Sequence, residues 1–505
     1  MNKRLFYRNT ALVTVCSLLL RLCGILFRIL LSGRIGAEGI GLYQLVFSVH
    51  VLGSTFALGG LLTAVTCLAT QRLSAQDDKG LRKLMRVCTR ISVLVGGISA
   101  CLLYGFAPQI SQLIGDSRSV TAVALCGIAL PCIGIDATLK GYFLARRRAW
   151  PSCIAQMLEQ TVRIGTIIWW LETAWDGTLE QACVWIIVGD ALAETVSCIY
   201  LSCAYHRDRK QCFPAEDTTQ KIPVPILRPL LYIALPLTAG RYLTTALRTV
   251  ENVLVPARLS RYTQSEALAL AQFGAVKGMA LPLVFFPSAL LMTVSGLLIP
   301  ELADAHALQH RRQVSRLVEI ALHITLISAI FVGGLFTAMG VELGQLLYHD
   351  HTVGLILLIL GPLTPIMYLD SVATVLLKGL GQQVRSLWYA VADSVIRIGL
   401  IWLLLPHYGL IGFLFVMLVS NLLTCALSTA RLLSVSGARI HWARWVILPS
   451  LAAIMGGQLG SYVPLSGIAY LSAGSVLYTA VYAVSIGLFR CFTREDWRQL
   501  TARKA

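Results

Sequence analysis

Two pairs of arginines lie inside long apolar stretches of the sequence, where a charge is costly. Arg21 and Arg28 are seven residues apart, and so are Arg241 and Arg248. Seven residues make two helical turns, so each pair would share one face of a helix. A guanidinium group binds phosphate through a planar fork of N–H donors. We therefore predict a cavity that binds a pyrophosphate or another polyanion, with Lys277 as a fifth positive charge.

Each of these arginines also has a structural interpretation. A long cationic side chain can extend to the membrane interface, or it can pair with a carboxylate. This alternative is strongest for Arg28 and Arg248, which lie near the ends of their apolar stretches, and weaker for Arg21 and Arg241, which lie deeper. The sequence leaves both interpretations open.

Two further pairs of opposite charge lie four residues apart within apolar stretches. Glu159 precedes Arg163, and Asp393 precedes Arg397. This spacing places the two side chains next to each other on a helix. We interpret both as structural ion pairs that allow a charged helix to be buried.

Asp190 and Glu194 have the same spacing but carry like charges. In a medium of low dielectric, one carboxylate of such a pair can hold a proton. The two residues are therefore candidates for ion or proton coupling, and the alternative is a rim that faces water.

The composition indicates that these residues are placed on membrane helices. Hydrophobic residues make up 56% of the 505 residues and charged residues 13%, whereas soluble proteins are usually about 25% charged. Soluble and disordered classes are thereby excluded. We find fourteen stretches long enough to cross a bilayer as helices, and no alternating barrel pattern. They lie near 10–33, 40–69, 88–108, 119–144, 152–172, 179–203, 227–250, 269–300, 317–340, 352–378, 386–405, 408–433, 443–462 and 466–489.

The basic residues predict the orientation of these helices. Of the 42 Lys and Arg residues, 30 fall at the N-terminus, the C-terminus and the even-numbered connections, and four fall in the odd-numbered connections. Because basic residues are enriched in cytoplasmic loops, we expect a multi-pass protein of the cytoplasmic membrane with both termini in the cytoplasm. The net charge of +17 is thus a topology signal, and we expect no binding of nucleic acid.

Other chemistry is not indicated. The 14 cysteines are scattered through apolar stretches, and neither a disulfide framework nor a metal site is predicted. The sequence has no phosphate-binding loop and no nucleophile elbow, and the odd-numbered connections are too short for a catalytic domain. We predict no catalytic residue, no cofactor and no metal, and therefore no enzyme.

An internal repeat organises the stretches. Four groups of residues recur in the second half of the sequence, 220 to 238 residues after their first occurrence. The matching groups are Arg21/Arg28 with Arg241/Arg248, Pro131/Asp136 with Pro365/Asp370, Glu159/Arg163 with Asp393/Arg397, and Lys140-Gly141 with Lys378-Gly379. Each copy contains six stretches, so the two copies would be parallel repeats, as in alternating-access transporters.

The repeat gives the predicted domain organisation. It comprises an N-lobe (1–203, helices 1–6), a cytoplasmic linker (204–226), a C-lobe (227–433, helices 7–12), two additional helices (434–490) and a cytoplasmic tail (491–505). The helices at 434–490 carry small residues at Ala452, Gly456 and Gly460, a pattern that favours close helix packing.

The segment Arg21-Leu22-Cys23-Gly24, together with Gly36-Ala37-Glu38-Gly39-Ile40-Gly41-Leu42-Tyr43-Gln44, resembles the polysaccharide-transporter branch of the MOP flippase superfamily. Within it, the chain is most similar to the stage V sporulation protein B group (SpoVB) and, more distantly, to MurJ-type lipid II flippases. The resemblance implies a MATE-like fold of two V-shaped lobes. It also implies that arginines of helices 1 and 7 engage a pyrophosphate and that helices 13 and 14 hold a lipid tail. Arg241 and Arg248 match by helix position alone, because the glycine-rich run after Arg28 has no counterpart after Arg248.

These observations predict a flippase that moves an undecaprenyl-pyrophosphate-linked saccharide across the membrane by alternating access. The resemblance points to lipid II, the peptidoglycan precursor, and to spore cortex formation. The expected partners are the lipid-linked oligosaccharide, membrane lipids and cell-wall synthesis proteins. A MATE-type multidrug or cation antiporter and a membrane glycan polymerase are the alternatives. The first would need carboxylates in its cavity, and the second would need a large outer loop.

Overall fold

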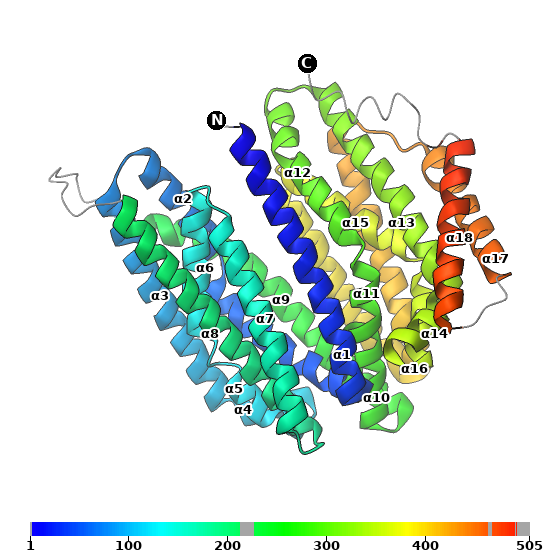
Figure 1. The fold of residues 1–505 in the computed structure, drawn as a ribbon, viewed down its shortest axis with the longest axis horizontal. Helices are drawn as coiled ribbons and strands as arrows, with labels where there is room; N and C mark the ends of the chain where they lie inside the picture. Colours follow the sequence, from blue (N-terminus) through cyan, green and yellow to red (C-terminus); the bar gives the residue numbers. More distant parts are fainter. Residues whose placement is uncertain (1–2, 213–226, 463–466, 490, 492–505) are drawn as a thin grey trace. The chain divides into compact units, whose positions relative to one another are not determined.

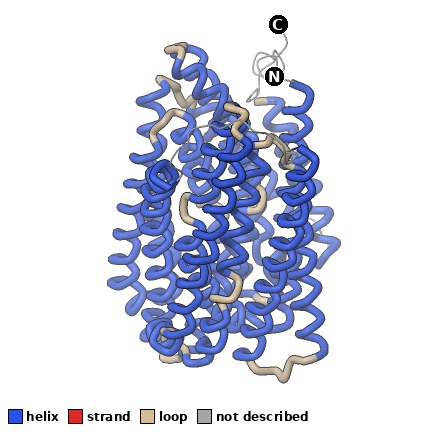
Figure 2. The backbone as a smooth tube through the Cα atoms, turned by 90° about the vertical axis from the view of Figure 1, so that its left-hand side faces the viewer, coloured by secondary structure: helices blue, strands red, loops and turns tan. Residues whose placement is uncertain are grey.

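The computed structural model describes residues 3–212, 227–462, 467–489 and 491. Figure 2 shows helices joined by loops, with no strand in these ranges. The predicted all-α polytopic membrane fold is confirmed by this helix content and by the apolar character of the helices. Most of the predicted linker 204–226 and the predicted tail 491–505 lie outside the described residues. The start of that linker is helical and forms the end of α8 (Leu179–Cys212).

The chain divides into two compact units, Met1–Ala257 and Arg258–Ala505. The lobe boundary that we predict at 204–226 stays a prediction. The helices of the first unit, labelled in Figure 1, are α1 (Lys3–Leu58), α2 (Leu61–Ser74), α3 (Asp78–Gly105), α4 (Ala107–Ile114), the short η1 (Ser117–Ser119), α5 (Val120–Leu125), α6 (Leu130–Ala145), α7 (Trp150–Thr173), α8 and most of α9 (Leu227–Thr263).

The second unit follows the same all-helical plan. Two of its segments, η2 and η3, are π-helical turns. Its elements are α10 (Glu266–Phe273), η2 (Gly274–Ala280), α11 (Leu281–Phe285), α12 (Ser288–Ala307), α13 (Arg311–Tyr348), α14 (His351–Leu360), α15 (Thr364–Gly379), α16 (Gln383–Ser436), η3 (Ala443–Ile447), α17 (Leu448–Ser461) and α18 (Gly467–Leu488).

Two of the longest helices, α1 and α16, each contain a sharp kink at a glycine. Gly36 in α1 has a φ of 68°, and Gly409 in α16 has a φ of 55°. Glycine adopts these positive φ values without the steric cost that a Cβ atom would bring. The kink divides α16 between the predicted stretches 386–405 and 408–433, and the kink in α1 separates 10–33 from the start of 40–69.

The number of membrane crossings stays a prediction. Among the described residues, eight helices are long and apolar enough to cross a membrane, or ten if each bent pair counts as one crossing. The difference from fourteen has physical reasons. The kinked helices α1 and α16 each combine two predicted stretches, and α17 has 14 residues, fewer than a crossing needs. The helices α7 and α9 are not among those that are apolar enough, whereas the predicted stretch 269–300 spans two of the helices that are.

The repeat seen in the sequence continues in the backbone. The predicted fourth and tenth stretches are both broken, with bends of 46° between Ser117–Leu125 and Leu130–Ala145 and of 64° between His351–Leu360 and Thr364–Gly379. The second helix of each pair begins next to a proline, Pro131 or Pro365. A Cβ added to Gly96 would lie 2.7 Å from Pro131, and one added to Gly333 would lie 3.2 Å from Pro365. Each unit therefore packs a glycine against the proline at its broken helix.

The two units have separate cores. In the first, buried residues of α2, α3, α6 and α8 form one apolar cluster. In the second, α13, α17 and α18 pack together, and the hydroxyls of Tyr478 and Tyr482 each donate to a carbonyl of α13 over 2.8 Å. A Cβ on Gly456 would lie 2.9 Å from Tyr478, which confirms the predicted close packing of this small-residue face.

Candidate functional site

Six charged side chains of the first unit form one network across three helices that contact one another. Each helix contributes two of them at a spacing of four residues, which places both on the same helical face. The six are Asp136 and Lys140 on α6, Glu159 and Arg163 on α7, and Asp190 and Glu194 on α8.

Arg163 is the centre of this network. Its Nε lies 2.6 Å from Oδ1 of Asp190, and its Nη2 lies 3.0 Å from Oε1 of Glu159 and 3.7 Å from Oε1 of Glu194. Asp190 is 4% exposed, so its carboxylate depends on Arg163 for charge compensation. The arginine thus holds together carboxylates from α7 and α8.

Lys140 extends the network to α6. Its ammonium group forms an ion pair with Asp136 and lies 3.9 Å from Oε2 of Glu159. The Ser197 hydroxyl of α8 donates to Oδ1 of Asp136 over 2.9 Å. Four carboxylates therefore face two cationic groups, and the network has an excess of negative charge when all six groups are ionised.

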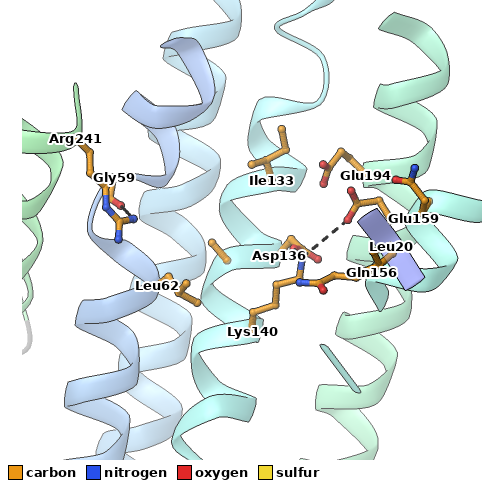
Figure 3. A pocket seen from close by; sticks show the side chains of 12 residues that line it. Leu20, Gly59, Leu62, Ile133, Asp136, Lys140, Gln156, Glu159, Glu194 and Arg241 are labelled. Carbon is orange, nitrogen blue, oxygen red and sulfur yellow. Dashed lines mark hydrogen bonds and ion pairs between the residues drawn. The ribbon is translucent and has the colours of Figure 1, made fainter. Parts of the chain in front are cut away.

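A cavity of about 440 Å³ opens beside this network. Figure 3 shows that its lining comes from several helices, with Arg241 of α9 next to Gly59 and the acidic residues across the cavity. One N–H of the Arg241 guanidinium donates to the carbonyl of Gly59 over 3.1 Å. The residues of the lining are Leu20, Gly59, Leu62, Ile133, Asp136, Ala137, Lys140, Gln156, Glu159, Gln160, Glu194 and Arg241.

A second cavity, of about 350 Å³, shares part of this lining. Arg28 of α1 lines it together with Arg163, Asp190 and Glu194. His50 also lines it and stacks on Phe47, with the ring centroids 6.1 Å apart. The two cavities thus combine cationic, anionic, amide and aromatic side chains, a set that can bind both phosphate and sugar hydroxyls.

The predicted arginines differ in their surroundings. Arg28 and Arg241 each line one of the two cavities. Arg21 and Arg248 belong to neither lining. Whether any of the four binds substrate stays a prediction, but the cavities favour Arg28 and Arg241.

Lys277 belongs to the second unit. It lies on the π-helical turn η2, half-buried, with its ammonium nitrogen 6.0 Å from the centroid of the Phe413 ring. A π-helical turn within a membrane helix often marks a functional position. A substrate contact of Lys277 stays a prediction.

The second unit contains a related ion pair. Nη2 of Arg397 lies 2.8 Å from Oδ2 of Asp393 and donates to the Ser420 hydroxyl over 2.6 Å. The Ser420 hydroxyl in turn donates to Asp393. Ser420 thus bridges the two members of this ion pair. The structural role of Asp393 and Arg397 stays a prediction, with which this geometry agrees.

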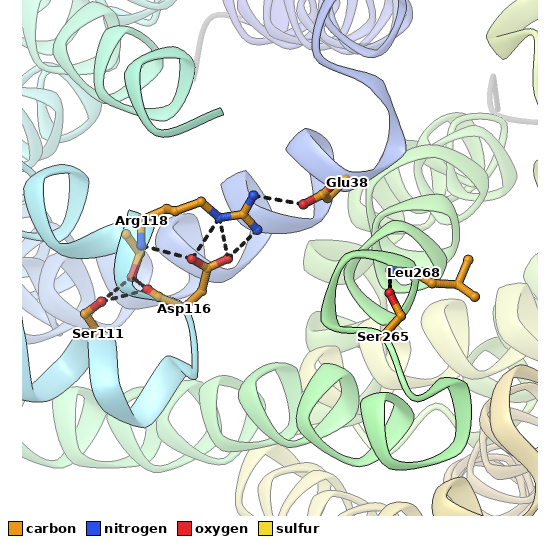
Figure 4. A network of polar contacts seen from close by, with 7 residues as sticks. Glu38, Ser111, Asp116, Arg118, Ser265 and Leu268 are labelled. Atoms are coloured by element: carbon orange, nitrogen blue, oxygen red, sulfur yellow. Dashed lines mark hydrogen bonds and ion pairs between the residues drawn. The ribbon is translucent and has the colours of Figure 1, made fainter. Parts of the chain in front are cut away.

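Sequence reasoning did not assign Asp136 and Lys140 to the site. They served only as repeat landmarks, although their spacing of four residues on α6 is the same as in the pairs that were chosen. Arg118 was also missed. Figure 4 shows it between Asp116 and Glu38, with Nη2 at 2.8 Å from Asp116 and Nη1 at 2.9 Å from Glu38. This ion pair holds the turn before α5 against the part of α1 that follows Gly36.

In the described part of the chain, no group of three or more His, Cys, Asp or Glu side chains is placed to hold a metal ion. The thirteen cysteines described there are all free thiols.

The chain matches a known protein family over more than half of its length. Residues 6–306 match the model of a family described as polysaccharide biosynthesis protein. The chain belongs to this family. It is also 21% identical to the stage V sporulation protein B of Bacillus subtilis (strain 168) over 99% of this chain and 98% of that protein. The resemblance to a polysaccharide family and, within it, to the stage V sporulation protein B group is thereby confirmed.

Solved structures agree on the fold. The lipid II flippase MurJ in an inward closed conformation has a TM-score of 0.72 at 14% identity, covering 94% of this chain and 98% of that chain. A MATE multidrug transporter of the MOP superfamily, inward-facing, has a TM-score of 0.64 at 15% identity, covering 85% and 100%. The chain therefore shares the fold of these two proteins.

Proposed function

We propose that this protein is a flippase that moves an undecaprenyl-pyrophosphate-linked saccharide across the cytoplasmic membrane by alternating access. Membership of the polysaccharide biosynthesis family supports a saccharide as part of the substrate. The observation that carries the proposal is that Arg28 and Arg241 line two polar cavities among membrane helices. A charged head group needs such a polar path, whereas an isoprenoid tail can stay in the lipid.

In this proposal the arginines and the acidic network have separate roles. Guanidinium groups of Arg28 and Arg241 bind the pyrophosphate through charge-assisted hydrogen bonds. Gln156 and Gln160, which also line the first cavity, bind saccharide hydroxyls. Arg21, Arg248 and Lys277 would contact the substrate at other steps of transport.

We further propose lipid II as the saccharide-lipid, with the spore cortex as its destination. The similarity in fold to a lipid II flippase and the full-length match to a sporulation protein support this choice. Cell-wall synthesis proteins are the protein partners that this assignment suggests.

The coupling ion is proposed to act on Asp190 and Glu194. Three carboxylates share the Arg163 guanidinium, and burying more negative than positive charge is unfavourable in a low dielectric. Proton uptake by Glu194 or Asp190 would relieve this imbalance. Such uptake could drive the change between the two access states.

The proposed topology has both termini in the cytoplasm. The lobes would then be 1–203 and 227–433, joined by the cytoplasmic linker 204–226 and followed by the helices at 434–490 and the tail 491–505. Reporter fusions after residues 210 and 264 would test it. We expect a cytoplasmic signal from the first and an extracytoplasmic signal from the second.

Binding of lipid II is the experiment that tests the proposed function. Purified full-length protein is mixed with lipid II, undecaprenyl phosphate and a cationic dye, and native mass spectrometry measures what each protein molecule retains. We expect selective retention of lipid II. Arg241→Ala should lower it by about tenfold or more, because it removes a charge-assisted contact worth about 1.5–3 kcal/mol. Arg34→Ala, at the exposed ion pair with Glu172, is the matched control and should bind normally.

The multidrug antiporter is the second candidate. The four carboxylates beside the cavities favour it, since cationic drugs bind carboxylates, and the MATE fold is shared. Retention of the dye without a preference for lipid II would support this candidate and leave the arginines with structural roles.

A further inference from the structure

The helical run from α1 to α2 is interrupted at Gly59 and Gly60, and α9 lies directly against this break. The backbone N–H of Gly60 donates to the Thr238 hydroxyl over 2.8 Å, and Arg241 donates to the Gly59 carbonyl over 3.1 Å. Thr238 and Arg241 are three residues apart and so lie on the same face of α9. Two neighbouring side chains of one helix thus bind two backbone groups at the break.

The break requires glycine at both positions. Gly59 has a φ of 33°, and a Cβ there would lie 2.0 Å from the Thr238 hydroxyl oxygen. A Cβ on Gly60 would lie 2.6 Å from the carbonyl oxygen of Ala234. The two glycines therefore allow the α9 backbone to approach the break closely.

Thr238 is fixed in place by its own hydrogen bonds. Its hydroxyl donates to the Ala234 carbonyl over 2.7 Å while it accepts the Gly60 N–H. Pro236 lies two residues earlier in α9 and has no N–H to continue the helical ladder. Thr238 thus joins α9 to the break close to the point where the hydrogen-bond ladder of α9 lacks a donor.

Arg241 is the residue that links this break to the cavity. The guanidinium group has five N–H donors, and the contact with Gly59 uses one of them through Nη1. The edge formed by Nε and Nη2 can still bind a phosphate in the bidentate manner. Gly59 and Arg241 both line the 440 Å³ cavity, so a ligand there reaches the guanidinium while it holds the break.

We propose that Thr238 is a positioning residue for substrate binding. It holds the break between α1 and α2 in the conformation whose Gly59 carbonyl aims the Arg241 guanidinium into the cavity. This proposal rests on the proposed function, because it assigns a pyrophosphate to Arg241. A guanidinium that is already oriented loses less side-chain freedom when it binds its ligand. Ligand binding should therefore stabilise the conformation of the break, and a stable break should in turn strengthen ligand binding.

Two measurements on the full-length protein in nanodiscs test the coupling. Native mass spectrometry gives the affinity for the probe, undecaprenyl pyrophosphate, and hydrogen exchange gives the protection of residues 55–66. We expect the probe to slow exchange in this segment of the wild-type protein. Thr238→Val should speed exchange there and weaken probe binding about fivefold, the effect of one net hydrogen bond. Thr238→Ser retains the hydroxyl and should restore both.

Thr249→Val is the matched control. The Thr249 hydroxyl contacts the Ser48 carbonyl over 3.3 Å, so this variant changes the same two helices away from the break. It should bind the probe as the wild type does. The positioning role would be overturned if the probe binds but leaves residues 55–66 unprotected from exchange. It would also be overturned if Thr238→Val and Thr238→Ser bind the probe with equal affinity. If the wild type does not retain the probe at all, the proposed function fails instead.

Discussion

Oδ1 of Asp190 lies 2.6 Å from Nε of Arg163, and this ion pair joins α8 to α7 inside the first unit. The same arginine faces Glu159 on its own helix and Glu194 one turn along α8. A pair predicted as a self-contained structural unit is therefore part of a larger network. The network connects the two residues chosen for ion coupling to the helices that line the cavities.

The central position of Arg163 predicts unequal effects on stability. Arg163→Gln removes the cation from three carboxylates and should lower the free energy of unfolding by about 3–5 kcal/mol. Asp190→Asn leaves Arg163 paired with Glu159 and should cost less, about 1–3 kcal/mol. Thermal unfolding of the purified protein in detergent measures both. Arg34→Gln, at an exposed pair, is the control and should cost about 0–1 kcal/mol. Equal losses for Arg163→Gln and Asp190→Asn would contradict the shared role of the arginine.

Glu194→Gln should change the pH dependence of transport. Glutamine is neutral at every pH and so imitates the protonated glutamic acid. We expect the variant to match the wild type at acidic pH, to differ from it at alkaline pH, and to show a flatter profile. Flipping of a fluorescent lipid-linked substrate in proteoliposomes at a series of pH values is the measurement. Glu172→Gln, at the exposed pair with Arg34, should keep the wild-type profile. A Glu194→Gln profile that follows the wild type throughout would exclude this residue from coupling.

Sequence patterns predicted the helices well but the site only in part. Spacing of four residues placed Glu159 next to Arg163, because such a pair depends on one helix alone. The apolar runs also divided the sequence close to both glycine kinks, at Gly36 and Gly409. The contact of Asp190 with Arg163 depends instead on how α7 packs against α8. A pattern within one helix carries no information about that distance.

The same limit applies to Arg241. In the sequence, Arg241 and Arg21 both lie well inside their apolar stretches, and the repeat predicts equal roles for these two arginines. The structure places Arg241 at the break between α1 and α2 and in the lining of a cavity, whereas Arg21 lines neither cavity. This difference arises because Gly59 and Gly60 let α9 approach, which becomes visible only when the helices are placed together.

Tyr142 and Asp208 give a prediction outside the cavities. The Tyr142 hydroxyl, fully buried, donates to Oδ2 of Asp208 over 2.7 Å, which ties α6 to the end of α8. Tyr142→Phe removes a hydrogen bond to a charged group and should lower the free energy of unfolding by about 1.5–3 kcal/mol. Tyr205, whose ring packs edge-on against Tyr142 with the centroids 4.9 Å apart, provides the control. Tyr205→Phe keeps that ring contact, so a smaller loss is expected in the same unfolding measurement. A loss for Tyr205→Phe as large as that for Tyr142→Phe would assign the effect to ring packing.

Gly96 and Gly97 are neighbours on α3, and alanine should affect them in opposite directions. A Cβ on Gly96 would lie 2.7 Å from backbone atoms of Pro131 at the start of α6, and such overpacking costs about 1–3 kcal/mol. A Cβ on Gly97 meets no atom within 4 Å among the described residues. Gly97→Ala should therefore stabilise the helix by about 0.5–1 kcal/mol, because alanine loses less backbone entropy. Thermal unfolding of the two variants side by side measures the contrast. The corresponding Gly333→Ala in α13 should resemble Gly96→Ala, since a Cβ there would lie 2.5 Å from the Gly361 carbonyl oxygen. If Gly96→Ala proves as stable as Gly97→Ala, the close packing of α3 against the broken helix does not require glycine at position 96.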